Sequence, residues 1–272
     1  MKYIRISRPR FWIYVLWPLI LGMAIGFDGS IYRLMFYVSL FFTFPANFLI
    51  YGINDIFDHE TDMLNIKKSW YEAVLDQKYR SDVRIIIIAI GIVWLWYSRF
   101  LGRDIFVAYC VWLVASTQYS SPVLRAKTIP IIDTIVSALI YVVPGIIWYM
   151  LMWGGQISWW LVLWGIAWSM AMHAYSAVPD ISADTSAGIS TVATYFGARD
   201  TLIVCSILYG LAALSLSAYP ILAVLIVWVY GTMMWLTLYT RQYLYYYRRF
   251  PLVNTCVGML LTLRVLVQKF AL

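Results

Sequence analysis

An acidic segment, NDIFDHETD at residues 54–62, directly follows a long apolar run and concentrates oxygen-bearing side chains. Asp55, Asp58 and Asp62 are three and four residues apart, so they share one face if a helix continues through the segment. Asn54 precedes Asp58 by four residues and has the same helical relationship to it. Carboxylate and amide oxygens are ligands that Mg²⁺ prefers, often together with phosphate oxygens of a substrate. The segment therefore predicts a site for a divalent cation and a phosphorylated substrate.

A second acidic pair, Asp180 and Asp184 in the sequence DISAD, follows another apolar run at helical spacing. The segment YSSPVLRAKTIP, at residues 119–130, adds Arg125 and Lys127, whose cationic groups suit phosphate oxygens. Taken alone, acids beyond a membrane helix are as consistent with a solvated loop as with a site. Two acidic clusters and a basic loop on one side of a membrane favour the site.

The composition indicates that the chain holding these residues is a membrane protein. The chain of 272 residues is 63% hydrophobic and only 12% charged, whereas soluble domains carry roughly 25% charged residues. Several apolar runs approach the ~20 residues that cross a bilayer as a helix. Helices satisfy their own backbone in lipid, so we expect an all-α integral membrane bundle in one domain, residues 1–272. The predicted nine transmembrane helices are approximately 11–27, 32–54, 83–98, 104–120, 131–153, 157–180, 201–218, 220–239 and 252–269.

The distribution of positive charge orients this bundle. If the N-terminus is cytoplasmic, 15 of the 20 Lys and Arg residues fall on the cytoplasmic side. Both acidic clusters and the basic loop then emerge on that side as well. We expect a multi-pass cell-membrane protein with its N-terminus and its active site facing the cytoplasm. The net charge of +7 is explained by topology and by attraction to anionic lipid, and no motif indicates nucleic-acid binding.

The two acidic motifs together resemble a known family. NDIFDHETD matches the NDxxDxxxD motif of UbiA-type intramembrane prenyltransferases, and DISAD matches their second DxxxD motif. SRPRFW before the first helix and YSSPVLRAKTIP are also similar to the family. The resemblance implies a UbiA-like fold and transfer of a prenyl group from an allylic diphosphate to a lipophilic acceptor, with Mg²⁺ as cofactor.

The resemblance also implies a role for each matching residue. The metal-binding set is Asn54, Asp55, Asp58, Asp62, Asp180 and Asp184, and the diphosphate-binding set is Arg125, Lys127, Lys67, Lys68 and Tyr119. Asp55, Asp58, Asp180 and Asp184 are expected to serve catalysis through these contacts. Tyr119 either bonds a phosphate oxygen or anchors the chain at the membrane interface. His173 is either the base that removes a proton from the product cation or a buried histidine with a structural hydrogen bond.

The acceptor is indicated by the residues before the second motif. HAYSAVPDISAD is similar to the lycopene elongase branch, which implies transfer from dimethylallyl diphosphate to lycopene in C50 carotenoid biosynthesis, with or without hydration. Other UbiA acceptors, such as a quinone ring or a chlorophyll precursor, stay open. A cation-binding membrane transporter is the alternative from another class. Transporters place ionisable groups near the membrane midplane, whereas these acids lie at helix ends, which favours the enzyme.

Overall fold

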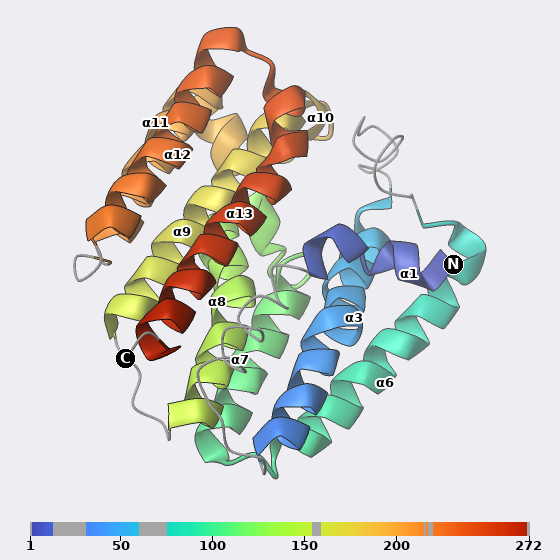
Figure 1. The fold of residues 1–272 in the computed structure, drawn as a ribbon. Helices are drawn as coiled ribbons and strands as arrows, with labels where there is room; N and C mark the ends of the chain where they lie inside the picture. Colours follow the sequence, from blue (N-terminus) through green and yellow to red (C-terminus); the bar gives the residue numbers. More distant parts are fainter. Residues whose placement is uncertain are drawn as a thin grey trace. The chain divides into compact units, whose positions relative to one another are not determined.

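The computed structural model describes residues 2–12, 31–59, 75–153, 159–214, 216 and 220–270. Within these ranges every regular element is a helix, which confirms the predicted all-α class. The α-helices shown in Figure 1 are α1 (Lys2–Ile6), α3 (Ile31–Phe57), α6 (Arg80–Ser98), α7 (Arg103–Gln118), α8 (Ile132–Trp153), α9 (Trp159–Ala177), α10 (Ile181–Ser186), α11 (Val192–Leu214), α12 (Pro220–Thr240) and α13 (Tyr243–Phe270). Short 3₁₀ turns are η1 (Pro9–Phe11), η2 (Gln77–Tyr79), η3 (Ala126–Thr128) and η4 (Val178–Asp180).

The predicted membrane helices largely correspond to observed ones. Eight of the nine predicted segments match α3, α6, α7, α8, α9, α11, α12 and α13. Most of the first predicted helix, 11–27, lies outside the described residues. By length and composition, 5 helices of the described part are apolar enough to cross a membrane. The chain is therefore a multi-pass membrane protein.

Two helices, α11 and α13, begin well before their predicted starts. Helix α11 begins at Val192 rather than 201, because Thr191 and Thr194 cap a first short turn. Gly197, whose backbone is not helical, separates this turn from the long straight part, which starts close to the predicted position. Helix α13 begins at Tyr243 and continues through Pro251, which the sequence reading had placed outside the helix. Helix α9 ends at Ala177, where the chain tightens into η4.

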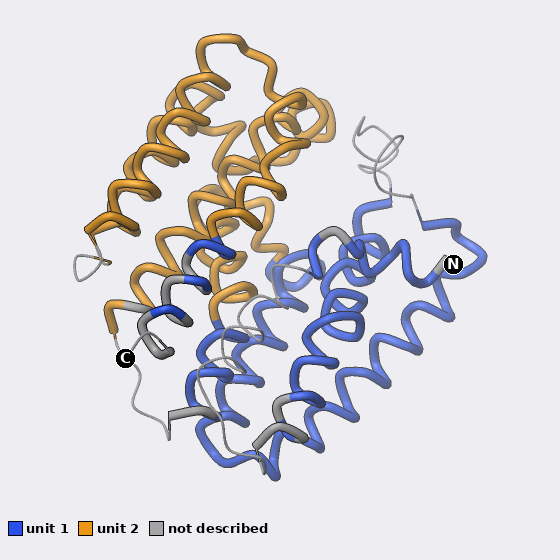
Figure 2. Tube along the Cα trace, viewed as in Figure 1, with its two compact units in different colours: residues 1–124, 143–156, 258–272 blue, residues 125–142, 157–257 orange. Residues whose placement is uncertain are grey.

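The chain divides into two compact units, which Figure 2 shows in blue and orange. Unit 1 comprises residues 1–124, 143–156 and 258–272, and unit 2 comprises residues 125–142 and 157–257. In unit 1, α3 packs against α1, α6 and α7. Its core is aromatic: Phe41 stacks on Trp94 with ring centroids 3.9 Å apart and also meets the edge of Trp112 at 5.8 Å. This packing holds α3, the helix whose end carries the first acidic motif, against α6 and α7.

In unit 2, α11 packs against both α9 and α12. Tyr209 of α11 and Tyr230 of α12 stack with ring centroids 4.0 Å apart. The Tyr230 hydroxyl accepts a hydrogen bond from Trp168 Nε1 at 3.0 Å and donates to Asn254 Oδ1 at 2.7 Å. This buried polar connection joins α9, α12 and α13 within the apolar interior, and such bonds hold membrane helices together because lipid offers no alternative partner.

Replacement of Tyr230 by phenylalanine is expected to destabilise unit 2 by about 1–3 kcal/mol, because the buried partners Trp168 and Asn254 lose a shared hydroxyl. Thermal unfolding of the purified protein in lipid, followed by loss of near-UV circular dichroism, measures the effect. Tyr239→Phe is the matched control, since Tyr239 lies on the same helix and its side chain is exposed. Equal midpoints for the two variants would contradict the prediction.

Candidate active site

The first acidic motif occupies the end of α3. Asn54 and Asp55 belong to the last turn of the helix, and the amide of Asp58 donates to the Asn54 carbonyl at 2.8 Å, so the helical path continues past Phe57. Asp55 and Asp58 are only 2% and 7% exposed. Two buried carboxylates one turn apart require compensating partners.

Arg8 provides the counter-charge for Asp55. Its Nη2 lies 3.1 Å from Asp55 Oδ1, and its guanidinium lies 4.3 Å from the centre of the Tyr51 ring. Arg8 has φ 48°, a left-handed conformation that is uncommon for a residue with a side chain. Its side chain is 12% exposed, so the ion pair is largely shielded from water. The N-terminal segment therefore closes over the first motif.

A second arginine compensates the end of α3. Carboxylates near a helix C-terminus oppose the helix dipole, whereas cations there are favourable. The Arg80 side chain, at the start of α6, donates from Nη2 to the carbonyl of Ile56 at 2.6 Å. Asp55 thus occupies an electrostatically unfavourable place that Arg8 and Arg80 offset, which favours a functional reason for the acid.

Ser120 contacts the polar atoms of the first motif. Its hydroxyl donates to Asn54 Oδ1 at 2.6 Å and lies 3.4 Å from Asp58 Oδ2. Ser120 is fully buried and directly follows Tyr119, at the end of α7. The turn after α7 therefore orients the oxygen atoms of Asn54 and Asp58.

The second acidic motif lies on two short elements of unit 2. Asp180 ends η4 and Asp184 lies in α10, and both side chains are half-buried. The carbonyl of Asp184 accepts from the amides of Ala187 and Ile189 at 3.2 and 2.8 Å, which turns the chain toward α11. The motif is thus placed by a compact turn rather than by a long helix.

The predicted basic residues belong to a tight turn before α8. Arg125 is half-buried with φ 49°, and Lys127 in η3 is buried with 9% exposure. The Arg125 carbonyl accepts from both the amide and the hydroxyl of Thr128 at 2.9 Å. The turn therefore fixes the backbone that carries both cations.

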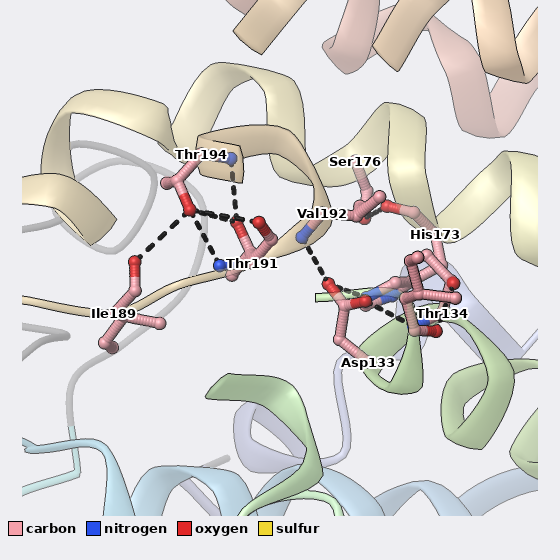
Figure 3. Close-up of polar contacts among 9 residues, drawn as sticks. Asp133, Thr134, His173, Ser176, Ile189, Thr191, Val192 and Thr194 are labelled. Carbon is pink, nitrogen blue, oxygen red and sulfur yellow. Dashed lines mark hydrogen bonds and ion pairs between the residues drawn. The ribbon is translucent and has the colours of Figure 1, made fainter. Parts of the chain in front are cut away.

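His173 is held near a buried carboxylate that the sequence reading did not include. Figure 3 shows Asp133 between His173 and Val192: Asp133 Oδ2 accepts from the Val192 amide at 2.9 Å and lies 3.8 Å from His173 Nε2. Asp133 Oδ1 accepts from the Thr134 amide at 2.7 Å. His173 is 14% exposed and Asp133 is fully buried. His173 on α9 and Val192 on α11 thus have the same carboxylate of α8 as a neighbour.

The predicted site residues fall into three groups. Unit 1 holds Asn54, Asp55, Asp58 and Tyr119, whereas unit 2 holds Arg125, Lys127, His173, Asp180 and Asp184. The remaining predicted residues lie outside the described part of the chain: Asp62, Lys67 and Lys68. The structure brings Asn54, Asp55 and Asp58 together at one helix end. The predicted convergence of both acidic motifs on one surface joins residues of different units and stays a prediction.

The donor set of the first motif fits Mg²⁺. In the described part of the chain, no group of three or more His, Cys, Asp or Glu side chains converges. Proteins often bind Mg²⁺ through one or two carboxylates, and phosphate oxygens of the substrate complete the coordination. The end of α3 offers two buried carboxylates and one amide oxygen, which is enough for such a site. Asn54, Asp55 and Asp58 therefore suit a metal held jointly with a diphosphate.

Sequence reasoning missed three residues of this environment: Arg8, Ser120 and Asp133. Arg8 and Ser120 lie in the segments SRPRFW and YSSPVLRAKTIP that resemble the family, but the sequence assigned neither of them a role. A signal for Asp133 was present, because a lone acid at the start of an apolar run is expensive in lipid unless it has a specific role.

Two named proteins are similar to this chain along most of its length. A lycopene elongase/hydratase from Haloarcula japonica is 36% identical over 266 residues, which cover 96% of this chain and 89% of the relative. A lycopene elongase/hydratase from Halobacterium salinarum is 35% identical over 274 residues, which cover 95% and 94% respectively. The resemblance to this branch, inferred above from the motifs, is confirmed.

The fold has a solved counterpart. A UbiA homologue from Archaeoglobus fulgidus, bound to GPP and Mg²⁺, has a TM-score of 0.71 at 17% identity and covers 95% of this chain and 100% of its own. The same homologue bound to DMAPP and Mg²⁺ also has a TM-score of 0.71. The family model of the UbiA prenyltransferases matches residues 15–255. This match favours the prenyltransferase over the transporter: with both acidic motifs inside the matched region, the chain belongs to the UbiA prenyltransferase family.

Proposed function

We propose that this membrane protein transfers a dimethylallyl group from dimethylallyl diphosphate to lycopene in a Mg²⁺-dependent reaction of C50 carotenoid biosynthesis. The observation that carries the proposal is the near full-length similarity to lycopene elongase/hydratases at 35 and 36% identity. The buried oxygen donors of the first motif support the dependence on Mg²⁺. The fold counterpart bound to DMAPP and Mg²⁺ supports the choice of donor.

In this proposal, the two acidic motifs would bind the donor diphosphate together with Mg²⁺. Asn54, Asp55, Asp58 and Asp62 would hold one metal ion, and Asp180 and Asp184 would hold a second. The basic and phenolic side chains that bind diphosphate oxygens are Arg125, Lys127, Lys67, Lys68 and Tyr119. Bound Mg²⁺ would supply positive charge that stabilises the departing pyrophosphate.

The reaction begins with breakage of the allylic C–O bond, whose electron pair leaves with pyrophosphate. The cationic side chains Arg125 and Lys127 stabilise the negative charge that grows on the leaving group. An end double bond of the acceptor supplies the electron pair of the new C–C bond and becomes a cation itself. His173 removes a proton from that cation. Capture by water instead would give a hydrated product.

We further propose one domain over residues 1–272, with the N-terminus and the site on the cytoplasmic side. The family match runs without interruption from 15 to 255 and includes residues of both units, which supports one domain. The charge asymmetry of the loops supports the orientation. Accessibility of introduced cysteines to a membrane-impermeant reagent in right-side-out cells would test the orientation.

The test of function uses the purified protein in lipid with Mg²⁺, lycopene and isotope-labelled dimethylallyl diphosphate. Mass spectrometry is expected to detect labelled C45 or C50 pigment, which should disappear when Mg²⁺ is chelated. Mg²⁺-dependent release of pyrophosphate without labelled pigment would discard lycopene and keep the reaction class. Neither signal, from folded protein in lipid, would overturn the proposed function.

Ser120→Ala is expected to lower turnover about ten-fold, because Asn54 Oδ1 loses a hydrogen bond of 2.6 Å and the first motif loses its orientation. The measurement is the rate of labelled pigment formation at saturating Mg²⁺. Ser121→Ala is the control, since the Ser121 hydroxyl donates to Gln118 instead, at 3.3 Å. A Ser120→Ala rate equal to that of Ser121→Ala would exclude the orienting role.

A further inference from the structure

Asp133, in the first turn of α8, is a fully buried carboxylate that binds no substrate in the mechanism above. Its Oδ1 accepts from the Thr134 amide at 2.7 Å, and its Oδ2 accepts from the Val192 amide at 2.9 Å. Burial of a carboxylate is costly unless its oxygens are hydrogen-bonded. These two hydrogen bonds offset part of the cost of burial. They do not explain why the chain has a carboxylate at this buried position instead of an apolar side chain.

The contacts of Asp133 bracket the segment that carries the second acidic motif. His173, 3.8 Å from Asp133 Oδ2, lies on α9 before that segment, and Val192 is the first residue of α11 after it. Between them are η4 and α10, of only 3 and 6 residues. Helices this short do not hold their own geometry, because helix nucleation is unfavourable. The places of Asp180 and Asp184 therefore depend on the two ends that Asp133 joins.

Asp133 is also connected to the basic turn. The Asp133 amide donates to the Ile129 carbonyl at 3.0 Å, and the Ile129 amide donates to the carbonyl of Ala126 in η3 at 3.1 Å. Ile131, between them, has φ 72°, a conformation that is strained for a β-branched residue. Surrounding contacts must hold such a residue in place. Asp133 is thus the point at which the basic turn and the second acidic segment are fixed to each other.

The contact with α11 is not needed to cap that helix. Thr191 and Thr194 form a reciprocal cap: the Thr194 amide donates to Thr191 Oγ1 at 3.3 Å, and the Thr191 amide donates to Thr194 Oγ1 at 2.7 Å (Figure 3). The cap does not pair the Val192 amide, which donates to Asp133 Oδ2 instead. The carboxylate therefore joins two elements rather than starting a helix.

We propose that Asp133 is a positioning residue of the diphosphate site in unit 2. It holds the segment of Asp180 and Asp184 in a fixed place relative to Arg125 and Lys127, so that acids and cations meet one diphosphate. The proposal rests on the function proposed above. A misplacement of about 1 Å in such a site lowers activity on the order of 10²-fold, so a rigid junction at the base of the site has a direct chemical effect.

The first test measures local opening in the absence of metal and substrate. In Asp133→Asn, one of the amides of Thr134 and Val192 must face an NH₂ group, because asparagine has a single acceptor oxygen. Hydrogen–deuterium exchange in peptides covering residues 178–191 is expected to be about ten-fold faster than in the unaltered protein. Asp104→Asn is the matched control, since Asp104 lies in the first turn of α7 and is exposed.

The second test measures binding of dimethylallyl thiolodiphosphate, a non-reacting donor analogue, in the presence of Mg²⁺. Asp133→Asn is expected to bind it at least about ten-fold more weakly, whereas Asp104→Asn binds it normally. If Asp133→Asn does not fold, His173→Gln removes only the contact to α9. His173→Gln should then weaken binding of the analogue about three-fold. Loss of the proton acceptor alone would not change the affinity for an analogue that does not react.

The outcomes separate the two proposals. Faster exchange and weaker binding in Asp133→Asn support the positioning role. Unchanged exchange in residues 178–191, or unchanged binding by Asp133→Asn while the unaltered protein binds the analogue, overturns the role of Asp133 and leaves the proposed function intact. Failure of the unaltered protein to bind the analogue overturns the proposed function, and the positioning role with it.

Discussion

Replacement of Asp58 by asparagine is expected to slow prenyl transfer about 10²- to 10³-fold, the loss that follows removal of one charge-stabilising group from an active site. The change keeps the size of the side chain and an acceptor oxygen for Ser120, which lies 3.4 Å from Asp58 Oδ2. It removes one of the two buried carboxylates proposed to hold Mg²⁺. The concentration of Mg²⁺ that gives half-maximal rate should therefore rise together with the loss of turnover.

Initial rates of labelled pigment formation across a Mg²⁺ titration measure both effects. Asp82→Asn is the control, because Asp82 is an exposed acid in the first turn of α6. An Asp58→Asn rate and Mg²⁺ dependence like those of Asp82→Asn would remove Asp58 from the metal site. A lower rate with unchanged Mg²⁺ dependence would assign Asp58 a role other than metal binding.

Replacement of Asp55 by asparagine is expected to destabilise unit 1 by about 3–5 kcal/mol, the cost of leaving a buried charge without its partner. The partner is Arg8, 3.1 Å away and 12% exposed. Removal of both charges in Arg8→Met/Asp55→Asn should recover most of this stability. The double variant should nevertheless stay inactive, because the first motif still lacks a carboxylate.

Thermal unfolding of the single and double variants in lipid gives the three values that this cycle needs. Asp76→Asn breaks the pair between Asp76 and Lys78, whose side chains are 49% and 64% exposed, and should cost about 1 kcal/mol or less. A double variant no more stable than Asp55→Asn would show that the ion pair does not explain the destabilisation.

Features with local signals in the sequence were predictable. The apolar runs gave eight helices that match described ones, and the spacing of Asn54, Asp55 and Asp58 placed them correctly at one helix end. Helix starts were less predictable where caps rather than apolar residues define them, as at Thr191 before α11. The Gly197 kink within α11 also has no local signal beyond the glycine itself.

The partners of the site residues were not predictable, because each comes from a distant part of the chain. Arg8 and Asp55 are 47 residues apart, Ser120 and Asn54 are 66 apart, and Val192 and Asp133 are 59 apart. Spacing rules describe neighbours on one helix and contain no information on which helices meet. The acids could therefore be recognised, whereas the groups that hold them required the structure.

The kink in α11 affects how the protein fits its bilayer. Gly197 has φ 76° and ψ 167°, a conformation that only glycine adopts easily, so residues 192–196 form a turn separate from the straight part of the helix. That straight part, 198–214, is about 26 Å long at 1.5 Å per residue, and the hydrocarbon layer is about 30 Å thick. A spanning segment shorter than the hydrocarbon layer is accommodated by local thinning of the bilayer and not by tilt. Because the turn at the start of this short segment is held by Asp133, we expect activity to fall in lipids with longer acyl chains, which increase the mismatch.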